Sequence, residues 1–144
     1  MFKSTSISQS EEYILFRSSV QLKKIQVNSS NEGHFVWKVF DCGKKTAKHN
    51  APVIFLPPME ATCDVFFKQM NFLSKRGYRV LSLEYPSYTS ADQFCIGFQN
   101  VLDVLQIFKV DVFACGLGGF FLSHFLQVNF GLIKCSILYT NKRK

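Results

Sequence analysis

The segment Val112–Phe121, "VFACGLGGFF", joins an apolar run to a cluster of small residues and then to a second apolar run. A nucleophile elbow is a strained strand-turn-helix with a small residue two positions before and two positions after the nucleophile. Ala114 and Gly118 fill these flanking positions, so Gly116 stands at the apex. Glycine readily adopts the positive φ of an apex, but it has no oxygen or sulfur for nucleophilic attack. The pattern therefore predicts an elbow without its nucleophile.

No neighbouring residue supplies the missing chemistry. Taking Cys115 as the apex would make Phe113 and Leu117 the flanking residues, and both are too large for the turn, so we expect a buried thiol. His124 lies on the helix that follows the turn, whereas a triad histidine comes from a late loop. No Asp or Glu follows Gly116 in the sequence. We therefore expect no catalytic residues in this chain.

The predicted site for an oxyanion beside the elbow also has few backbone N–H donors. Enzymes with such a turn use an amide after an earlier strand to hold the negative charge that develops on the substrate. Pro57 and Pro58 follow that strand and have no N–H, which leaves the Met59 N–H as a donor. A dinucleotide-binding fingerprint would need a glycine at position 121, where this chain has Phe121. The G-K-[S/T] sequence of a P-loop does not follow the glycines either, so we expect no cofactor. Phosphate binding by the N–H groups at the helix start stays open as an alternative.

The composition is that of one folded domain. The chain has 144 residues, of which 47% are hydrophobic and 16 are Phe, more aromatic bulk than disordered chains carry. The net charge of +7 comes from short, separate clusters, which favours a solvated surface over a patch for nucleic acid or an anionic membrane. Five cysteines without a C-x-x-C pair favour reduced thiols over disulfides or zinc. We therefore predict no metal site and no nucleic-acid partner.

Strand and helix patterns alternate around the predicted elbow. Two alternating segments on either side of "NSSNEG" predict an antiparallel hairpin, and short apolar runs predict buried parallel strands. The predicted strands cover 20–27, 34–43, 51–58, 78–86, 110–115 and 133–140, and the predicted helices cover 62–77, 91–108 and 118–128. We expect Asp64 to cap the first of these helices and Gly77 to end it. This alternation predicts an α/β fold with a mostly parallel sheet.

Five segments resemble the maspardin family, which is α/β-hydrolase-like, in their order and spacing. They are "VQLKKIQV", "IFLPPMEATCDVFFKQM", "GYRVLSLEYPSY", "FCIGFQNVLDVLQIFKV" and "VFACGLGGFFLSHF", and the resemblance covers about Tyr13 to Tyr139. It implies a partial α/β-hydrolase fold that lacks its C-terminal half. It also implies a non-catalytic cytosolic protein that binds a protein partner, such as a receptor cytoplasmic tail, and associates peripherally with endosomal or trans-Golgi membranes.

The chain departs from that family at the elbow and in its length. The family carries a serine at the position of Gly116, and it is longer than this chain. We therefore expect a disordered tail over 1–12, the N-terminal part of an α/β-hydrolase domain over 13–140, and a basic tail over 141–144. A domain of that extent leaves a sheet edge and helix faces uncovered, so we also expect marginal stability.

Two alternatives stay open beside a non-catalytic binding protein. One is an atypical hydrolase with an unusual nucleophile or with a site completed by other residues, and the other is a truncated product without function. The polar start of the sequence lacks the apolar region of a signal peptide, which favours the cytosol. Residues 112–133 are uncharged and long enough to cross a bilayer, but their glycines and polar residues favour a strand, a turn and a helix.

Overall fold

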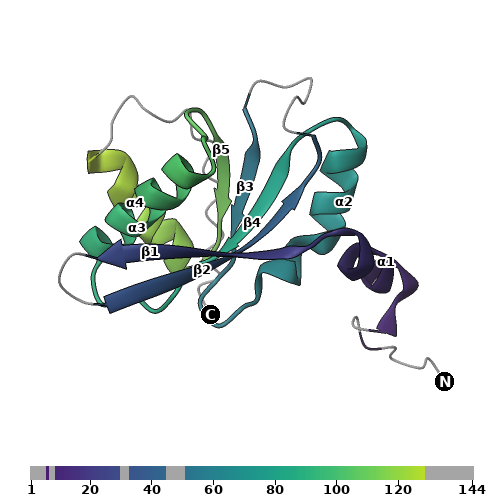
Figure 1. Ribbon diagram of the computed structural model, residues 1–144, viewed down its shortest axis with the longest axis horizontal. Helices are drawn as coiled ribbons and strands as arrows, with labels where there is room; N and C mark the ends of the chain where they lie inside the picture. The colour runs from purple at the N-terminus through teal and green to yellow at the C-terminus, as the bar shows by residue number, and fades with distance from the viewer. Residues whose placement is uncertain (1–5, 7–8, 30–32, 45–50, 129–144) are drawn as a thin grey trace.

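Five strands form one sheet, and helices lie on both of its faces (Figure 1). The computed structural model describes residues 6, 9–29, 33–44 and 51–128. The strand order across the sheet is β1-β2-β4-β3-β5. The strand bounds are Leu22–Ser29 for β1, Gly33–Cys42 for β2, Val53–Leu56 for β3, Val80–Glu84 for β4 and Asp111–Ala114 for β5.

The strand pairing confirms the hairpin and the parallel strands predicted from the sequence. β1 pairs antiparallel with β2, and β2 pairs antiparallel with β4. β3 lies between β4 and β5 and runs parallel to both, so that Ile54 stands opposite Leu81 on one side and Val112 on the other. The fold is therefore of the predicted α/β class, and the carboxyl ends of three parallel strands meet at one edge of the sheet.

Four helices are present in the described part of the chain, and three of them were predicted. Their bounds are Glu11–Ser19 for α1, Phe67–Lys75 for α2, Ala91–Val104 for α3 and Leu117–Val128 for α4. α3 ends before the predicted residue 108, because Gln106 adopts φ +55° and the chain turns back. In this turn the Ile107 N–H donates to the Leu102 carbonyl oxygen, with N and O 2.9 Å apart.

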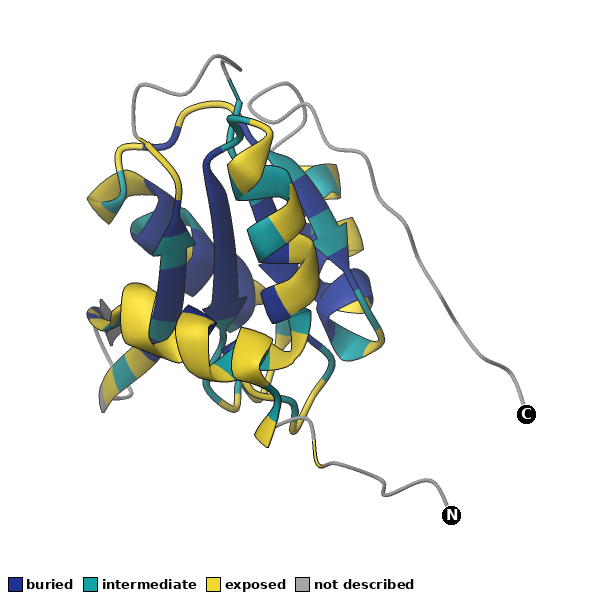
Figure 2. Ribbon diagram, turned by 90° about the vertical axis from the view of Figure 1, so that its right-hand side faces the viewer, coloured by how far each residue is buried: buried dark blue, intermediate teal, exposed yellow. Residues whose placement is uncertain are grey.

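Alternation along the strands divides the core into two layers, one on each face of the sheet (Figure 2). Successive side chains of a strand point to opposite faces. On β3, Ile54 and Leu56 belong to the layer that includes the buried Phe side chains of α3 and α4. Phe55, between them in sequence, belongs to the layer that includes Phe16 of α1 and Met70 of α2. β3 thus contributes side chains to both layers, which explains its continuous apolar run.

The sequence analysis missed α1, because Phe16 is its buried residue whereas the neighbouring apolar residues Ile14 and Leu15 are exposed. The Ser10 side chain caps its first turn by accepting from the Tyr13 N–H. The Phe16 ring packs edge-on against Phe40 of β2, with ring centroids 5.3 Å apart, and lies 6.0 Å from the Phe67 ring of α2. Tyr13 of α1 also packs edge-on against Phe67, so two aromatic side chains attach α1 to the domain.

The predicted capping role of Asp64 is wrong, whereas Gly77 ends α2 as predicted, with φ +90°. Asp64 lies within the 3-10 turn η2, Cys63–Phe66, which precedes α2, and the residue before η2 makes no capping hydrogen bond through its side chain. The Asp64 carboxylate instead accepts hydrogen bonds from the hydroxyl groups of Tyr13 and Thr62. The Asp64 side chain therefore links α1 to η2, a contact between distant segments that local pattern cannot reveal.

Some predictions fall outside the described residues. The predicted strand over 133–140 is one of them, and the division into 1–12, 13–140 and 141–144 stays a prediction. Among the described residues, no helix combines the length and the apolar character needed to cross a membrane.

A buried ion pair joins β2 to the start of β4. Arg79 donates from Nε and from one Nη to the two carboxylate oxygens of Asp41, at 3.1 and 2.9 Å. The exposed fractions of the two side chains are 10% and 7%, and the Lys23 ammonium adds a longer contact to Asp41 at 3.6 Å. Removing one member of such a pair leaves an uncompensated charge away from water.

We expect Asp41→Asn to lower the free energy of unfolding by about 3 kcal/mol, because the Arg79 guanidinium then stays buried without a counter-charge. Asp103→Asn is the matched control, since Asp103 is exposed and accepts one hydrogen bond from Gln99. This control should cost less than about 1 kcal/mol. Urea unfolding followed by circular dichroism measures both, and equal losses in the two variants would contradict the role given to the buried pair.

Candidate functional site

β5 passes into α4 through a tight turn, with Gly116 at its apex. Gly116 adopts φ +55°, in the left-handed region that favours glycine. The Cys115 N–H donates to the Leu56 carbonyl oxygen at 3.2 Å, which fastens the turn to the end of β3. The Phe120 N–H donates to the Gly116 carbonyl oxygen at 3.3 Å and begins the helix. The structure thus has the predicted strand, turn and helix, with glycine at the apex.

Glycine is favoured at positions 116 and 118 of the turn for two different reasons. A Cβ atom at Gly118 would lie 3.3 Å from the Pro57 carbonyl oxygen and 3.4 Å from Leu56 Cβ, both tighter than usual. A Cβ atom at Gly116 would meet Pro58 Cβ at 3.5 Å, an ordinary contact. Close approach of α4 to β3 therefore requires a small residue at 118. The apex has room for a side chain, and only its positive φ favours glycine.

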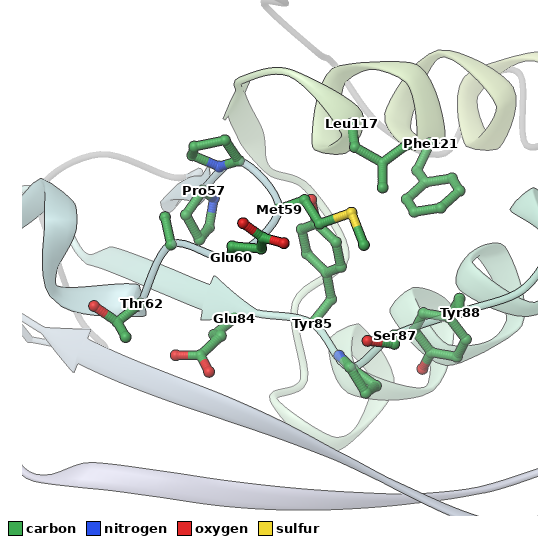
Figure 3. A pocket seen from close by; sticks show the side chains of 13 residues that line it. Pro57, Met59, Glu60, Thr62, Glu84, Tyr85, Ser87, Tyr88, Leu117 and Phe121 are labelled. Carbon is green, nitrogen blue, oxygen red and sulfur yellow. The ribbon is translucent and has the colours of Figure 1, made fainter.

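A cavity of about 390 Å³ lies beside this turn (Figure 3). Its walls come from the loop 57–62 after β3, from residues 84–88 at the end of β4, and from Leu117 and Phe121 of α4. A volume of this size is within the range of small-ligand sites, and open α/β sheets bind their ligands at this edge. The cavity is therefore the candidate functional site of the described residues.

Tyr85 carries a buried hydroxyl without a hydrogen-bond partner among the described residues. Burial, together with the neighbouring Cys115 thiol, raises the pKa of Tyr85 to about 12, and the nearby Gly118 N–H opposes this shift. The phenol is therefore neutral at physiological pH. Figure 3 shows its ring extending from the end of β4 toward Leu117. Because the hydroxyl oxygen is buried, it belongs to the packing of the wall, and the Tyr85 ring lines the cavity.

Tyr88 is held in the cavity wall by the core. The Trp37 indole N–H donates to the Tyr88 hydroxyl oxygen at 2.7 Å, and Trp37 itself is fully buried on β2. Gly97 of α3 makes room for this contact, because a Cβ atom at that position would overlap the Tyr88 hydroxyl. Burial raises the pKa of Tyr88, which keeps this phenol protonated as well. A glycine on a helix thus determines the shape of the cavity.

Two carboxylates complete the polar lining of the cavity. Glu84, at the end of β4, accepts from the Lys38 ammonium at 2.8 Å and from the Cys63 N–H at 3.1 Å. Glu60 lies in the loop after β3, where it adopts φ +69°, a conformation that few residues other than glycine take up.

Burial and the adjacent Glu84 carboxylate raise the pKa of Cys63 to about 12, so this thiol is inert at neutral pH.

The residues weighed from the sequence as catalytic candidates do not meet in the cavity. Cys115 is partly exposed, and neither Cys115 nor His124 lines the cavity. His124 Nε2 lies 2.8 Å from a carboxylate oxygen of Asp92, in a contact between α4 and α3. Pro57 and Pro58 do line the cavity, beside the apex of the turn. In the part of the chain that the structure describes, no cluster of three His, Cys, Asp or Glu side chains could hold a metal ion.

The sequence analysis missed the side chains that give the cavity its chemistry. Tyr85 and Tyr88 stand in "EYPSY", at and just beyond the end of the strand predicted over 78–86, and the position alone could have marked them as site residues. No local sequence pattern marks Glu60 as a cavity residue, because its position in the cavity wall depends on a backbone conformation with φ +69°.

We expect Gly97→Ala to displace the Tyr88 ring and to break its hydrogen bond with Trp37. Loss of a partner for the buried indole N–H should lower the free energy of unfolding by about 1–3 kcal/mol. Trp37 is the sole tryptophan of the chain, so its fluorescence emission measures the change directly. Tyr88→Phe, which removes the hydroxyl without adding an atom, separates the lost hydrogen bond from the displaced ring. An unchanged emission spectrum in Gly97→Ala would show that this contact does not position Tyr88.

Comparison with known proteins gives close sequence relatives, although no protein-family model matches the chain. Maspardin of Danio rerio is 44% identical over 124 residues, that of Rattus norvegicus is 43% identical over 121 residues, and that of Homo sapiens is 42% identical over 121 residues. These matches cover 86%, 84% and 84% of this chain. They cover 39%, 45% and 38% of the relatives, so the chain spans less than half the length of the maspardins it matches.

Solved structures share the fold. A carboxylesterase of Nitrososphaera gargenis has a TM-score of 0.65 at 16% identity, over 80% of this chain and 44% of its own. An epoxide hydrolase from Vigna radiata has a TM-score of 0.65 at 16% identity, over 85% of this chain and 38% of its own. Identity this low shows the fold alone, and the coverage shows that the described residues form part of an α/β-hydrolase fold. With the sequence identities above, we conclude that the aligned region of this chain is similar to the maspardins and has part of an α/β-hydrolase fold.

Proposed function

We propose that this chain is a non-catalytic binding protein and that its ligand occupies the cavity beside the elbow. The observation that carries the proposal is Gly116 at the apex of the turn, with φ +55°. In a hydrolase of this fold the apex side chain attacks the substrate. Glycine supplies no attacking atom, and this holds whatever other residues complete the site.

The surroundings of the apex support the same proposal. The histidine that follows Gly116 in the sequence is His124, which pairs with Asp92 and does not line the cavity. Pro57 and Pro58 occupy the loop that would supply an oxyanion donor, and neither has an N–H. A turn whose apex has no attacking atom can border a binding cavity, but it cannot form the covalent intermediate of a hydrolase with this fold.

We propose a protein partner for this site, and the relation to the maspardins supports this choice. A receptor cytoplasmic tail is the kind of partner that the family suggests, which gives the chain the role of an adaptor in endosomal or trans-Golgi trafficking. The corresponding location is the cytosol with peripheral attachment to those membranes. Because the chain spans only part of its relatives, these assignments concern the aligned region.

A hydrolase is the second candidate, and the cavity at the carboxyl ends of the strands favours it, as does the fold shared with a carboxylesterase and an epoxide hydrolase. Turnover of a short-chain p-nitrophenyl ester by the purified chain distinguishes the two functions. The non-catalytic proposal predicts hydrolysis no faster than with denatured protein. Hydrolysis above that level that disappears in Cys115→Ala would show a cysteine-dependent enzyme instead.

We expect Gly116→Ser to be inactive toward the same ester, because no histidine among the described residues lines the cavity to take the proton from a serine at the apex. Gly116→Ala is the matched control, since it places the same Cβ atom at the same positive φ without the hydroxyl. Both variants should lose about 1–2 kcal/mol of stability through backbone strain, as measured by urea unfolding. Esterase activity in Gly116→Ser that exceeds the activity of Gly116→Ala would overturn the proposal.

A further inference from the structure

The cavity is acidic, although the chain is basic overall. The sequence has 17 Lys and Arg against 10 Asp and Glu. The charged side chains that line the cavity are nevertheless two carboxylates, Glu60 and Glu84, and none of the lining residues is a Lys, Arg or His. A concave wall of one sign attracts ligand groups of the opposite sign. Cationic groups are therefore favoured in the cavity over anionic ones.

The two carboxylates are not equivalent. Glu84 already has a counter-charge in Lys38, at 2.8 Å, and a further donor in the Cys63 N–H. Glu60 is exposed and makes no hydrogen bond or ion pair among the described residues. The Ala61 N–H donates to the Pro58 carbonyl oxygen at 3.1 Å, which closes the turn that carries Glu60. Glu60 is thus the carboxylate that a ligand can engage without displacing a partner.

Aromatic rings provide a second and independent attraction for a cation. Tyr85, Tyr88 and Phe121 line the cavity, and the rings of Tyr85 and Phe121 meet edge-on with centroids 6.0 Å apart (Figure 3). The face of an aromatic ring attracts an ammonium or guanidinium group. The phenol rings of Tyr85 and Tyr88 therefore contribute to the cavity wall as aromatic surface.

The remaining walls suit an aliphatic chain. Met59 and Leu117 are apolar members of the lining, and Met59 is exposed at the rim. Lysine and arginine carry their charge at the end of such a chain and bury the methylene groups along apolar surface. The chemistry of the walls therefore matches one amphipathic side chain, with an apolar stem and a cationic head.

We propose that the cavity binds a lysine or arginine side chain presented by a protein partner, with Glu60 and the tyrosine rings receiving the cationic head. This inference rests on the proposed binding function and adds the chemical class of the ligand. It differs from the substrate of a hydrolase at the same place, since no reacting carbonyl and no covalent step are involved.

The test uses three pentapeptides that differ only at the central residue, which is lysine, norleucine or glutamate. Norleucine keeps an aliphatic stem and removes the charge. Trp37, the sole tryptophan, bonds to Tyr88 in the cavity wall, so its fluorescence reports binding, and calorimetry measures the same titrations independently. We expect the lysine peptide to bind roughly fivefold or more tightly than the norleucine peptide, the glutamate peptide to bind most weakly, and added salt to reduce the difference.

Glu60→Gln should bring the lysine and norleucine affinities to within about twofold of each other, since an exposed carboxylate contributes through its charge. Glu12→Gln is the matched control, because Glu12 is exposed on α1, outside the cavity, and the change in net charge is the same. Circular dichroism verifies that both variants are folded.

Two results would overturn the inference in distinguishable ways. Equal binding of the lysine and norleucine peptides, or tighter binding of the glutamate peptide, would refute the cationic class but leave the cavity as a binding site. No binding of any peptide would also remove the cavity as the place where a partner's side chain binds. The absence of catalysis is tested separately by the Gly116→Ser variant.

Discussion

The packing of the β5–α4 turn on the end of β3 is the constraint on which the site depends. The Cys115 N–H is bonded to the Leu56 carbonyl oxygen, and a side chain at 118 would press on Leu56 and Pro57. Because β3 lies between β4 and β5, this contact fixes where the neighbouring loops can run. The cavity is the space left between the turn, the loop after β3 and the end of β4.

In this arrangement the shape of the turn does not depend on the presence of a catalytic side chain. The small residue at 118 keeps α4 close to β3, and the positive φ at 116 keeps the shape of the apex. Neither feature needs an attacking atom, so the scaffold of a hydrolase persists in a maspardin relative that has none at this position. A cavity with a neutral phenol, an available carboxylate and aromatic walls offers polar and apolar groups for binding.

The sequence predicted features that depend on neighbouring residues and missed features that depend on distant ones. Alternation identified the hairpin and the parallel strands, and the spacing of Ala114 and Gly118 located the turn. α1 went unpredicted because Phe16 is its buried contact, and Asp64 was assigned as a cap although its carboxylate joins two segments. The link from Trp37 to Tyr88 spans 51 positions of the chain, so no local pattern contains it. The chemistry of the cavity arises from such contacts.

The central claim is that the elbow of this chain holds no nucleophile, and covalent labelling tests it most directly. A fluorophosphonate phosphonylates an activated serine in a single step, with loss of fluoride, without requiring the rest of a catalytic cycle. The account predicts that intact-mass spectrometry of the labelled chain shows no adduct under conditions that fully label a carboxylesterase of this fold. A stoichiometric adduct that peptide mapping assigns to a residue lining the cavity would contradict it.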